Sequence, residues 1–423
     1  MAAGRSTFRD YLFFWAGQLI SVLGSSVSQF VIIWWITLET ESVLYLSFAS
    51  FLGFVPTIVF SPFAGVLADR WNRKALIAAT DLLQALATVV LIFLFWLGSV
   101  SIALVLVILT FRGVMQAFHY PASSAIVPLM VPREKLSRIN GLNYLLTGAV
   151  TLVGPVAAAV LLGIWEIHQI LWIDAITFVI AVVPLVLIVI PSVRLKHEKS
   201  SFKEDFVEGV SFVKGAKGFL TLLVLATGLN FLLTPLSTLL PFFVRFDHFG
   251  DAPQLALVSA FFQAGILAGG LLMSVKRGFK NRMAMIALSI YVVFAGYVLV
   301  ALTPTGLFWF MAIGALVMTF CLPIANVLIQ TIVQTVIPLK MQGRVGAVIG
   351  AIASAATPAS MIISGPVAAF AGTATLFLGC AVLGVLLLTF SWFFTDVRLV
   401  EKMNLPTDGG LAAQSAAADK TGS

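Results

Sequence analysis

The sequence contains few charged residues for its length. Lys, Arg, Asp and Glu make up 10% of the 423 residues, hydrophobic residues make up 60%, and the mean hydropathy is +1.06. A water-soluble domain of this size could not cover so much apolar surface with so few charged side chains. The composition therefore excludes a soluble globular protein and indicates an integral membrane protein.

Cysteine is also scarce, and the patterns that bind metals or nucleotides are missing. Cys321 and Cys380 are the two cysteines, and both lie within apolar runs, which argues against a disulfide framework and against a metal site. No glycine-rich nucleotide loop is visible, so we expect no cofactor and no ATP-driven activity. No nucleophile–base pair stands out either, and we expect the protein not to be an enzyme.

Apolar runs long enough to cross a bilayer recur along nearly the whole chain, and they predict twelve helices. The predicted spans are 11–38, 43–68, 75–97, 100–128, 139–163, 168–190, 218–245, 254–275, 283–303, 306–336, 343–372 and 373–395. A polar link separates six spans from six. The predicted organisation is an N-terminal six-helix bundle at 1–190, a cytoplasmic linker at 191–217, a C-terminal six-helix bundle at 218–395, and a cytoplasmic, disordered tail at 396–423.

The positions of the basic residues predict the orientation. With twelve spans and the N-terminus inside, 23 of the 25 Lys and Arg residues lie on the cytoplasmic side. Arg245 falls on the other side, and Arg112 lies within a span. This distribution follows the positive-inside rule and predicts a multi-pass protein of the cell membrane with both termini cytoplasmic. It also accounts for the net charge of +7 without nucleic acid as a partner.

Weak matches between the two halves occur in the same order. Residues 154–158 (Gly-Pro-Val-Ala-Ala) recur at 365–369, and the pair Pro132 and Arg138 matches Pro338 and Arg344. These matches predict two six-helix repeats that face a substrate path at their interface.

One loop interrupts the apolar sequence after the second predicted span. Residues 65–74 read Gly-Val-Leu-Ala-Asp-Arg-Trp-Asn-Arg-Lys. This stretch resembles the signature loop of the major facilitator superfamily, whose pattern Gly-x-Leu-x-Asp-Arg-x-x-Arg-Lys is filled at every position. The alternative, an ordinary positively charged loop, explains Arg70, Arg73 and Lys74 but not Gly65 or Asp69. The resemblance implies an all-α membrane protein with two pseudo-symmetric six-helix bundles.

The same loop is a candidate conformational latch. Asp69 stands at the C-terminal end of a helix, where an anion is unfavourable unless a cation faces it. Arg344, at the start of the eleventh span, is the candidate partner. We expect this pair to hold the outward-facing form closed on the cytoplasmic side, together with Gly65, Arg70, Arg73 and Lys74.

Polar side chains gather on the first, fourth, seventh and tenth spans, which line the central cavity in the superfamily. Lipid does not satisfy polar groups, so such stripes need either a cavity or a hydrogen-bonding neighbour helix. The predicted substrate cavity contains Gln18, Ser21, Ser25, Gln29, Gln116, Asn230, Thr234, Asn326 and Gln330.

Asp81, Arg112 and Asp174 are charged residues within predicted spans, where each needs a partner or a function. Arg112, followed by Gln116, resembles the fourth-helix Arg motif linked to proton coupling in the superfamily, although Ala117 stands where that motif has glycine. Asp174 is either the proton carrier or a cap near its helix start. Asp81 is expected to pair with nearby cytoplasmic basic residues. His119 either titrates or has a hydrogen-bonded packing role.

Gly154 and Pro155, preceded by Gly148, are similar to the fifth-helix motif of superfamily antiporters. The first glycine is displaced here, and Ala158 and Ala159 replace the last glycine pair. The alternative is a packing kink, since small residues permit close helix approach and proline bends a helix.

Several stretches resemble the macrolide-efflux and siderophore-exporter branch of the superfamily. They are Phe8-Arg9 with Gln18 and Leu23-Gly24, residues 118–122, residues 174–178 and residues 342–345. This resemblance implies a drug–proton antiporter that exports bulky amphipathic compounds, with protons as the coupling ion and membrane lipids around a monomer. Two alternatives stay open: a dedicated transporter of a siderophore, lysophospholipid or metabolite, by uniport or import, and a membrane sensor without transport.

Overall fold

The computed structural model is helical and describes residues 3–190, 211, 219–276, 279, 281–337 and 342–402. Within these residues, twelve helices are long and apolar enough to cross a membrane, as the sequence predicted. The first half contains α1 (Ala3–Thr40), α2 (Val43–Arg70), α3 (Arg73–Trp96), α4 (Ile102–Ser124), the short α5 (Val127–Met130) and η1 (Arg133–Lys135), α6 (Leu136–Leu162) and α7 (Ile167–Leu187). The second half contains α9 (Phe219–Phe242), η2 (Phe243–Asp247), α10 (Ala252–Val275), α11 (Arg282–Ala301), α12 (Phe308–Val336), α13 (Gln342–Ala371), α14 (Thr373–Phe394) and η3 (Asp396–Lys402).

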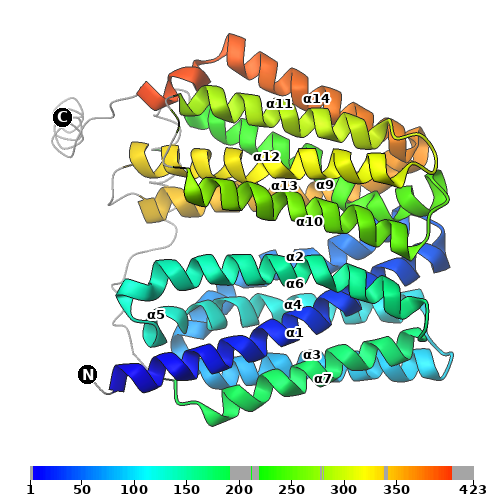
Figure 1. The fold of residues 1–423 in the computed structure, drawn as a ribbon, viewed down its shortest axis with the longest axis vertical. Coiled ribbons are helices and arrows are strands. Elements are labelled where there is room, and N and C mark those ends of the chain that lie inside the picture. The colour runs from blue at the N-terminus through cyan, green and yellow to red at the C-terminus, as the bar shows by residue number, and fades with distance from the viewer. Residues whose placement is uncertain are drawn as a thin grey trace, which may run out of the picture.

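The two halves form two bundles that lie side by side, with the start of α1 and the end of η3 at the same end of the molecule (Figure 1). We call this end the terminal end and the other the opposite end. The predicted linker at 191–217 lies, apart from Ser211, outside the described residues.

Helix pairing repeats from one half to the other. In the first half α1 packs on α6 and α7, α2 packs on α4, and α3 packs on α7. In the second half α9 packs on α13 and α14, α10 on α12, and α11 on α14. Each pairing recurs six membrane helices later, so the predicted fold of two pseudo-symmetric six-helix bundles is confirmed.

The halves meet where α6 packs on α10 and where α2 packs on α13. At the opposite end, Ser47 of α2 donates a hydrogen bond to the Met361 carbonyl (2.7 Å), and its hydroxyl lies 3.0 Å from that of Ser364. Trp34 and Leu46 belong to a buried cluster that also contains many second-half residues. The buried cluster around Tyr11, Phe14 and Ile77, at the terminal end, contains first-half residues only. Packing between the halves is therefore strongest at the opposite end.

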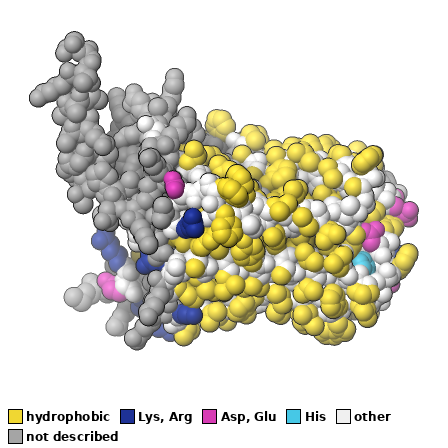
Figure 2. Space-filling model, turned by 90° about the horizontal axis from the view of Figure 1, so that it is seen from above, with side chains coloured by type: hydrophobic (Ala, Val, Ile, Leu, Met, Phe, Trp, Pro, Cys, Tyr) yellow, Lys and Arg dark blue, Asp and Glu magenta, His cyan; other side chains and the backbone are white. Residues whose placement is uncertain are grey.

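The surface has the character of a membrane protein. Apolar side chains cover the middle of the face in Figure 2, and Lys and Arg side chains lie at its terminal end. Large apolar side chains that point outward, such as Val107, Val186 and Phe390, are more than half exposed. An exposed apolar belt of this kind is favourable in contact with lipid and unfavourable in contact with water.

The predicted disordered tail begins too early in the sequence. Residues 396–402 form η3, a 3₁₀ helix, instead of disordered chain. Val397 and Val400 are fully buried and belong to the core cluster of the second half. Burial of these two valines explains the difference, because a tail with apolar anchors packs where a polar one stays solvated.

We predict that Gly365→Val loosens the contact between α2 and α13. A Cβ atom at Gly365 would lie 2.7 Å from the Ser47 Cβ, so the helices would have to separate. Overpacking of this kind destabilises by about 1–3 kcal/mol, measurable as a lower Tm in detergent. Gly350→Val on the same helix is the control, because nothing lies within 4 Å of a Cβ there. Equal Tm values for the two variants would contradict the prediction.

Candidate functional site

Two ion pairs lie inside the first half, and both basic residues stand on α4. The Arg112 guanidinium lies 3.0 Å from the Asp174 carboxylate of α7, and His119 Nε2 lies 3.1 Å from the Asp81 carboxylate of α3. The side chains of Asp174 and Asp81 are 0% and 2% exposed, those of Arg112 and His119 13% and 15%. Seven helical residues, about 10 Å, separate the two bases on one face of α4. All four residues that the sequence marked as candidates for proton coupling are thus brought together.

Hydroxyl groups complete the surroundings of Asp174. Ser25 of α1 donates to Oδ1 (2.9 Å), and Thr88 of α3 donates to Oδ2 (2.9 Å). Arg112 in turn donates to the Thr88 hydroxyl (3.2 Å). Asp174 is therefore no cap of its helix, which begins with a capping box of Glu166 and Gln169. A buried charge with several hydrogen bonds of this kind is stable only while its partners remain.

Asp81 has a different partner from the one predicted. The expected pairing with cytoplasmic loop residues is wrong: besides His119, Asp81 accepts a hydrogen bond from Gln18 Nε2 of α1 (3.3 Å). Asp81 lies two turns into α3, level with the second half of α4, and is turned into the bundle, where it is 1% exposed. Its side chain therefore meets α4 and α1 instead of the loop.

Close approach of α1 to α7 makes the Asp174 site possible. A Cβ atom at Gly24 would lie 2.0 Å from the Thr177 hydroxyl and 3.1 Å from the Asp174 Cα. Glycine lets the two helix backbones come together and brings Ser25 into reach of Asp174. Sequence reasoning missed Thr88. The sequence did contain a feature that could have identified Thr88: it lies seven residues after Asp81, the same spacing that separates Arg112 from His119 on α4.

The residues predicted to line a substrate cavity fall into two groups. Gln18 and Ser25 bind the two carboxylates, and Ser21 is buried. Thr234 is also buried and donates to the Asn230 carbonyl. The remaining side chains are exposed: Gln29, Gln116, Asn230, Asn326 and Gln330. The polar stripe of α1 thus belongs mainly to the ion-pair network, while α4, α9 and α12 present exposed amide side chains, of which Asn230 donates to the Ala226 carbonyl (3.1 Å).

The basic residues of the signature loop connect helices within the first half. Lys74 Nζ donates to the carbonyls of Val186 (2.8 Å) and Ile188 (2.7 Å) at the end of α7. Arg73 lies 3.5 Å from the carbonyl of Ala125, at the end of α4. Cations at helix C-termini are favourable because they oppose the helix dipole. Both residues thus fix the start of α3 against neighbouring helix ends.

The other predicted latch residues are only partly described. The side chains of Asp69, Arg70 and Arg344 lie outside the described ones, so their predicted pairing stays a prediction. Gly65 has open space around it: no atom outside its own helix lies within 4 Å of a Cβ built there. Packing in this conformation therefore does not require a glycine at this position.

The antiporter-like residues of α6 lie at close contacts between helices. A Cβ atom at Gly148 would lie 2.3 Å from the Leu267 side chain of α10, across the interface of the halves. A Cβ atom at Gly154 would lie 2.1 Å from the Ser26 hydroxyl of α1. Pro155 stands inside the helix. Small residues here allow α6 to approach both α1 and α10, which is the packing role weighed from the sequence.

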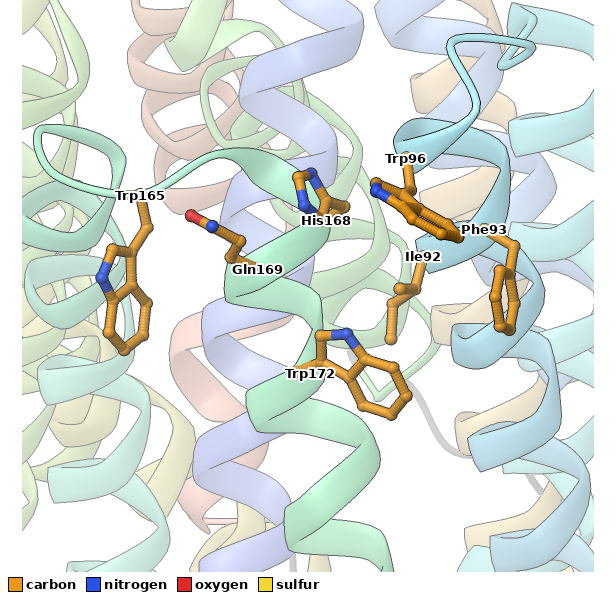
Figure 3. A pocket seen from close by; sticks show the side chains of 7 residues that line it. All are labelled: Ile92, Phe93, Trp96, Trp165, His168, Gln169 and Trp172. Atoms are coloured by element: carbon orange, nitrogen blue, oxygen red, sulfur yellow. The ribbon is translucent and has the colours of Figure 1, made fainter.

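An aromatic pocket of about 490 Å³ lies at the opposite end, between α3 and the start of α7. Figure 3 shows Trp96 and Phe93 of α3 on one side and His168 and Trp172 of α7 on the other. His168 Nδ1 lies 3.2 Å from the Glu166 carboxylate. Indole side chains at this level of a membrane protein are typical of the bilayer interface. The sequence reasoning did not single out this pocket.

The family model and the related sequences that match this chain point to the same protein family. The family model described as Major Facilitator Superfamily matches residues 14–359. The chain is 32% identical over 353 residues to Macrolide efflux protein A of Streptococcus pyogenes. The aligned residues cover 83% of this chain and 87% of that protein. It is 30% identical to Macrolide efflux protein A of Enterococcus faecalis, over 73% of this chain and 96% of that protein. It is 24% identical to the multidrug efflux pump Tap of Mycolicibacterium fortuitum, over 90% of this chain and 95% of that protein.

Solved structures share the fold. The nucleoside transporter NupG superposes with a TM-score of 0.74 at 12% identity, over 90% of this chain and 99% of that one. A bacterial homologue of the iron transporter ferroportin, in its inward-facing state, superposes with a TM-score of 0.66 at 15% identity, over 90% and 98%. At these identities the likeness concerns the fold alone.

We predict that Arg112→Met destabilises the protein more than the double change Arg112→Met with Asp174→Asn. The single variant leaves a fully buried carboxylate without its cation, which costs about 3–5 kcal/mol, whereas the double variant removes both charges. Thermal unfolding of all four members of the cycle measures the coupling. Arg245→Met is the control, because its partner Asp251 is 70% exposed and such pairs contribute less than about 1 kcal/mol. Additive effects at Arg112 and Asp174 would disprove the coupling.

Proposed function

The chain belongs to the Major Facilitator Superfamily, and we propose that this transporter exports bulky amphipathic, macrolide-like molecules across the cell membrane in exchange for protons. Similarity to two macrolide efflux proteins over most of their length supports the substrate class and the direction. The observation that carries the coupling ion is the pair of buried carboxylates, each held by a base on α4.

Proton exchange at these carboxylates would change what α4 is attached to. A carboxylate that takes up a proton loses its charge, and its attraction to the neighbouring cation falls. Protonation of Asp174 thus releases Arg112 from α7, while a proton moving between Asp81 and His119 changes the link from α4 to α3. In this proposal the protonation state of the network selects between the two arrangements of the halves.

The distribution of charge and packing supports an inward-facing form. Lys and Arg side chains lie at the terminal end, and the positive-inside rule puts that end in the cytoplasm (Figure 2). The first-half residues that join the buried cluster of the second half, such as Trp34, Leu46 and Ile170, all lie toward the opposite end, which is then the sealed outer side. Superfamily transporters work by rocking the halves around a central site. The exposed amides of α4 and α12, such as Gln116 and Asn326, would suit a substrate with polar groups on a large apolar body.

A second candidate is a dedicated solute transporter. The chain is 24% identical to the Staphyloferrin A transporter of Staphylococcus aureus, over 54% of this chain and 58% of that protein. The polar amides of α9 and α12 would suit such a solute as well. Flux of a siderophore and not of a macrolide in the same vesicles would favour this candidate.

We predict that Asp174→Asn and Asp81→Asn each abolish uphill export, because an amide does not carry the proton. Purified protein in proteoliposomes with an imposed pH gradient should accumulate a macrolide at least tenfold more than either variant. Asp251→Asn, at an exposed carboxylate on the opposite end, should export normally. If both buried variants still concentrate the drug, the proton path is wrong; gradient-independent flux in the unmodified protein would instead indicate uniport.

We also predict that Asp69→Asn shifts the protein toward its inward-facing form. Loss of the anion removes the proposed attraction to Arg344, which holds the cytoplasmic side closed when the protein faces outward. Cysteine pairs across the cytoplasmic ends of α2 and α13 should cross-link less efficiently in the variant. Unchanged cross-linking would show that the latch does not depend on Asp69.

A further inference from the structure

An apolar groove of about 330 Å³ runs along the outer side of the first half, between α3 and α7. Asp81 is the one charged residue among those that line it, and its side chain is 2% exposed. The groove is lined by Asp81, Leu82, Ala85, Phe178, Val179, Val182, Val183, Val186 and Leu187. A ligand here would therefore contact hydrocarbon almost alone.

The length of the groove matches one leaflet of a bilayer. From Leu187, at the terminal end, to Phe178 is nine helical residues, or about 13 Å along α7. Half of the hydrocarbon core of a bilayer measures about 15 Å. A chain lying along the groove would start at the membrane surface and end near the middle of the bilayer.

A cation stands at the terminal end of this groove. Lys74 Nζ donates to the carbonyl of Val186, which itself lines the groove, and to that of Ile188. An ammonium group has three N–H donors, and these two carbonyls take two of them. A positive charge beside an apolar slot at the membrane surface is the combination that recognises the phosphate of an acidic lipid.

We propose that the groove binds one acyl chain of an anionic phospholipid, whose phosphate contacts Lys74. The lipid would bridge the end of α7 and the start of α3, the same two elements that Lys74 joins. Its acyl chain would lie against α3 and α7 over the apolar side chains of the groove, beside the buried Asp81. This lipid site does not depend on the transported substrate.

Native mass spectrometry of the full chain tests the site, with palmitoyl-oleoyl phosphatidylglycerol and palmitoyl-oleoyl phosphatidylcholine as probes. Lys74→Gln should weaken phosphatidylglycerol binding about fivefold, equivalent to about 1 kcal/mol, and leave phosphatidylcholine unchanged. Ala85→Phe and Val183→Phe, which fill the groove from either side, should weaken both lipids. Lys276→Gln, at the same end of the other half, and Leu86→Phe, at an exposed position beside the groove, are the matched controls.

Three results would overturn the proposal. The first is an unchanged preference for phosphatidylglycerol in Lys74→Gln. The second is unchanged lipid binding in both groove-filling variants, which are independent of one another should either fail to fold. The third is displacement of phosphatidylglycerol by erythromycin in the unmodified protein but not in Ala85→Phe or Val183→Phe, which would assign the groove to the transported substrate.

Discussion

A carboxylate kept away from water needs a permanent partner, and this requirement organises the first half of the molecule. Asp174 and Asp81 lie on α7 and α3, their bases lie on α4, and hydrogen bonds from α1 reach both. Four helices are thus joined by charge as well as by apolar packing. Because the penalty for an unpaired buried charge is several kcal/mol, these helices cannot shift relative to each other unless a proton or a new partner intervenes.

The two halves of the structure contribute different features. The ion-pair network belongs to the first half, whereas the second half contributes the larger part of the apolar core and exposed amides on α9 and α12. The two halves share the opposite end of the molecule through the contacts of α2 with α13. A change of charge in one half is then transmitted to the other through the contacts of α2 with α13 and of α6 with α10, and the buried Ser47 and Ser364 lie in the first of these.

Much of the fold could be predicted from the sequence because lipid imposes simple rules. Twelve apolar runs, the loop at residues 65–74 and the placement of Lys and Arg determine helix number and family. The four ionisable residues of the site were also identifiable, since each is costly in a bilayer. Their pairing was not, because the partner of Asp81 depends on how α3 is rotated about its axis, and a sequence pattern gives only which residues share a face. Val397 and Val400 show the same limit: two valines in a polar stretch decide whether η3 packs.

The position of both bases on α4 has a mechanical consequence. Arg112 and His119 stand two turns apart on one rigid rod, so a turn of that rod about its axis stretches both ion pairs at once. Loss of one contact would then ease loss of the other. A single helix would in this way link its contact with α7 to its contact with α3, so that the two ion pairs form and break together.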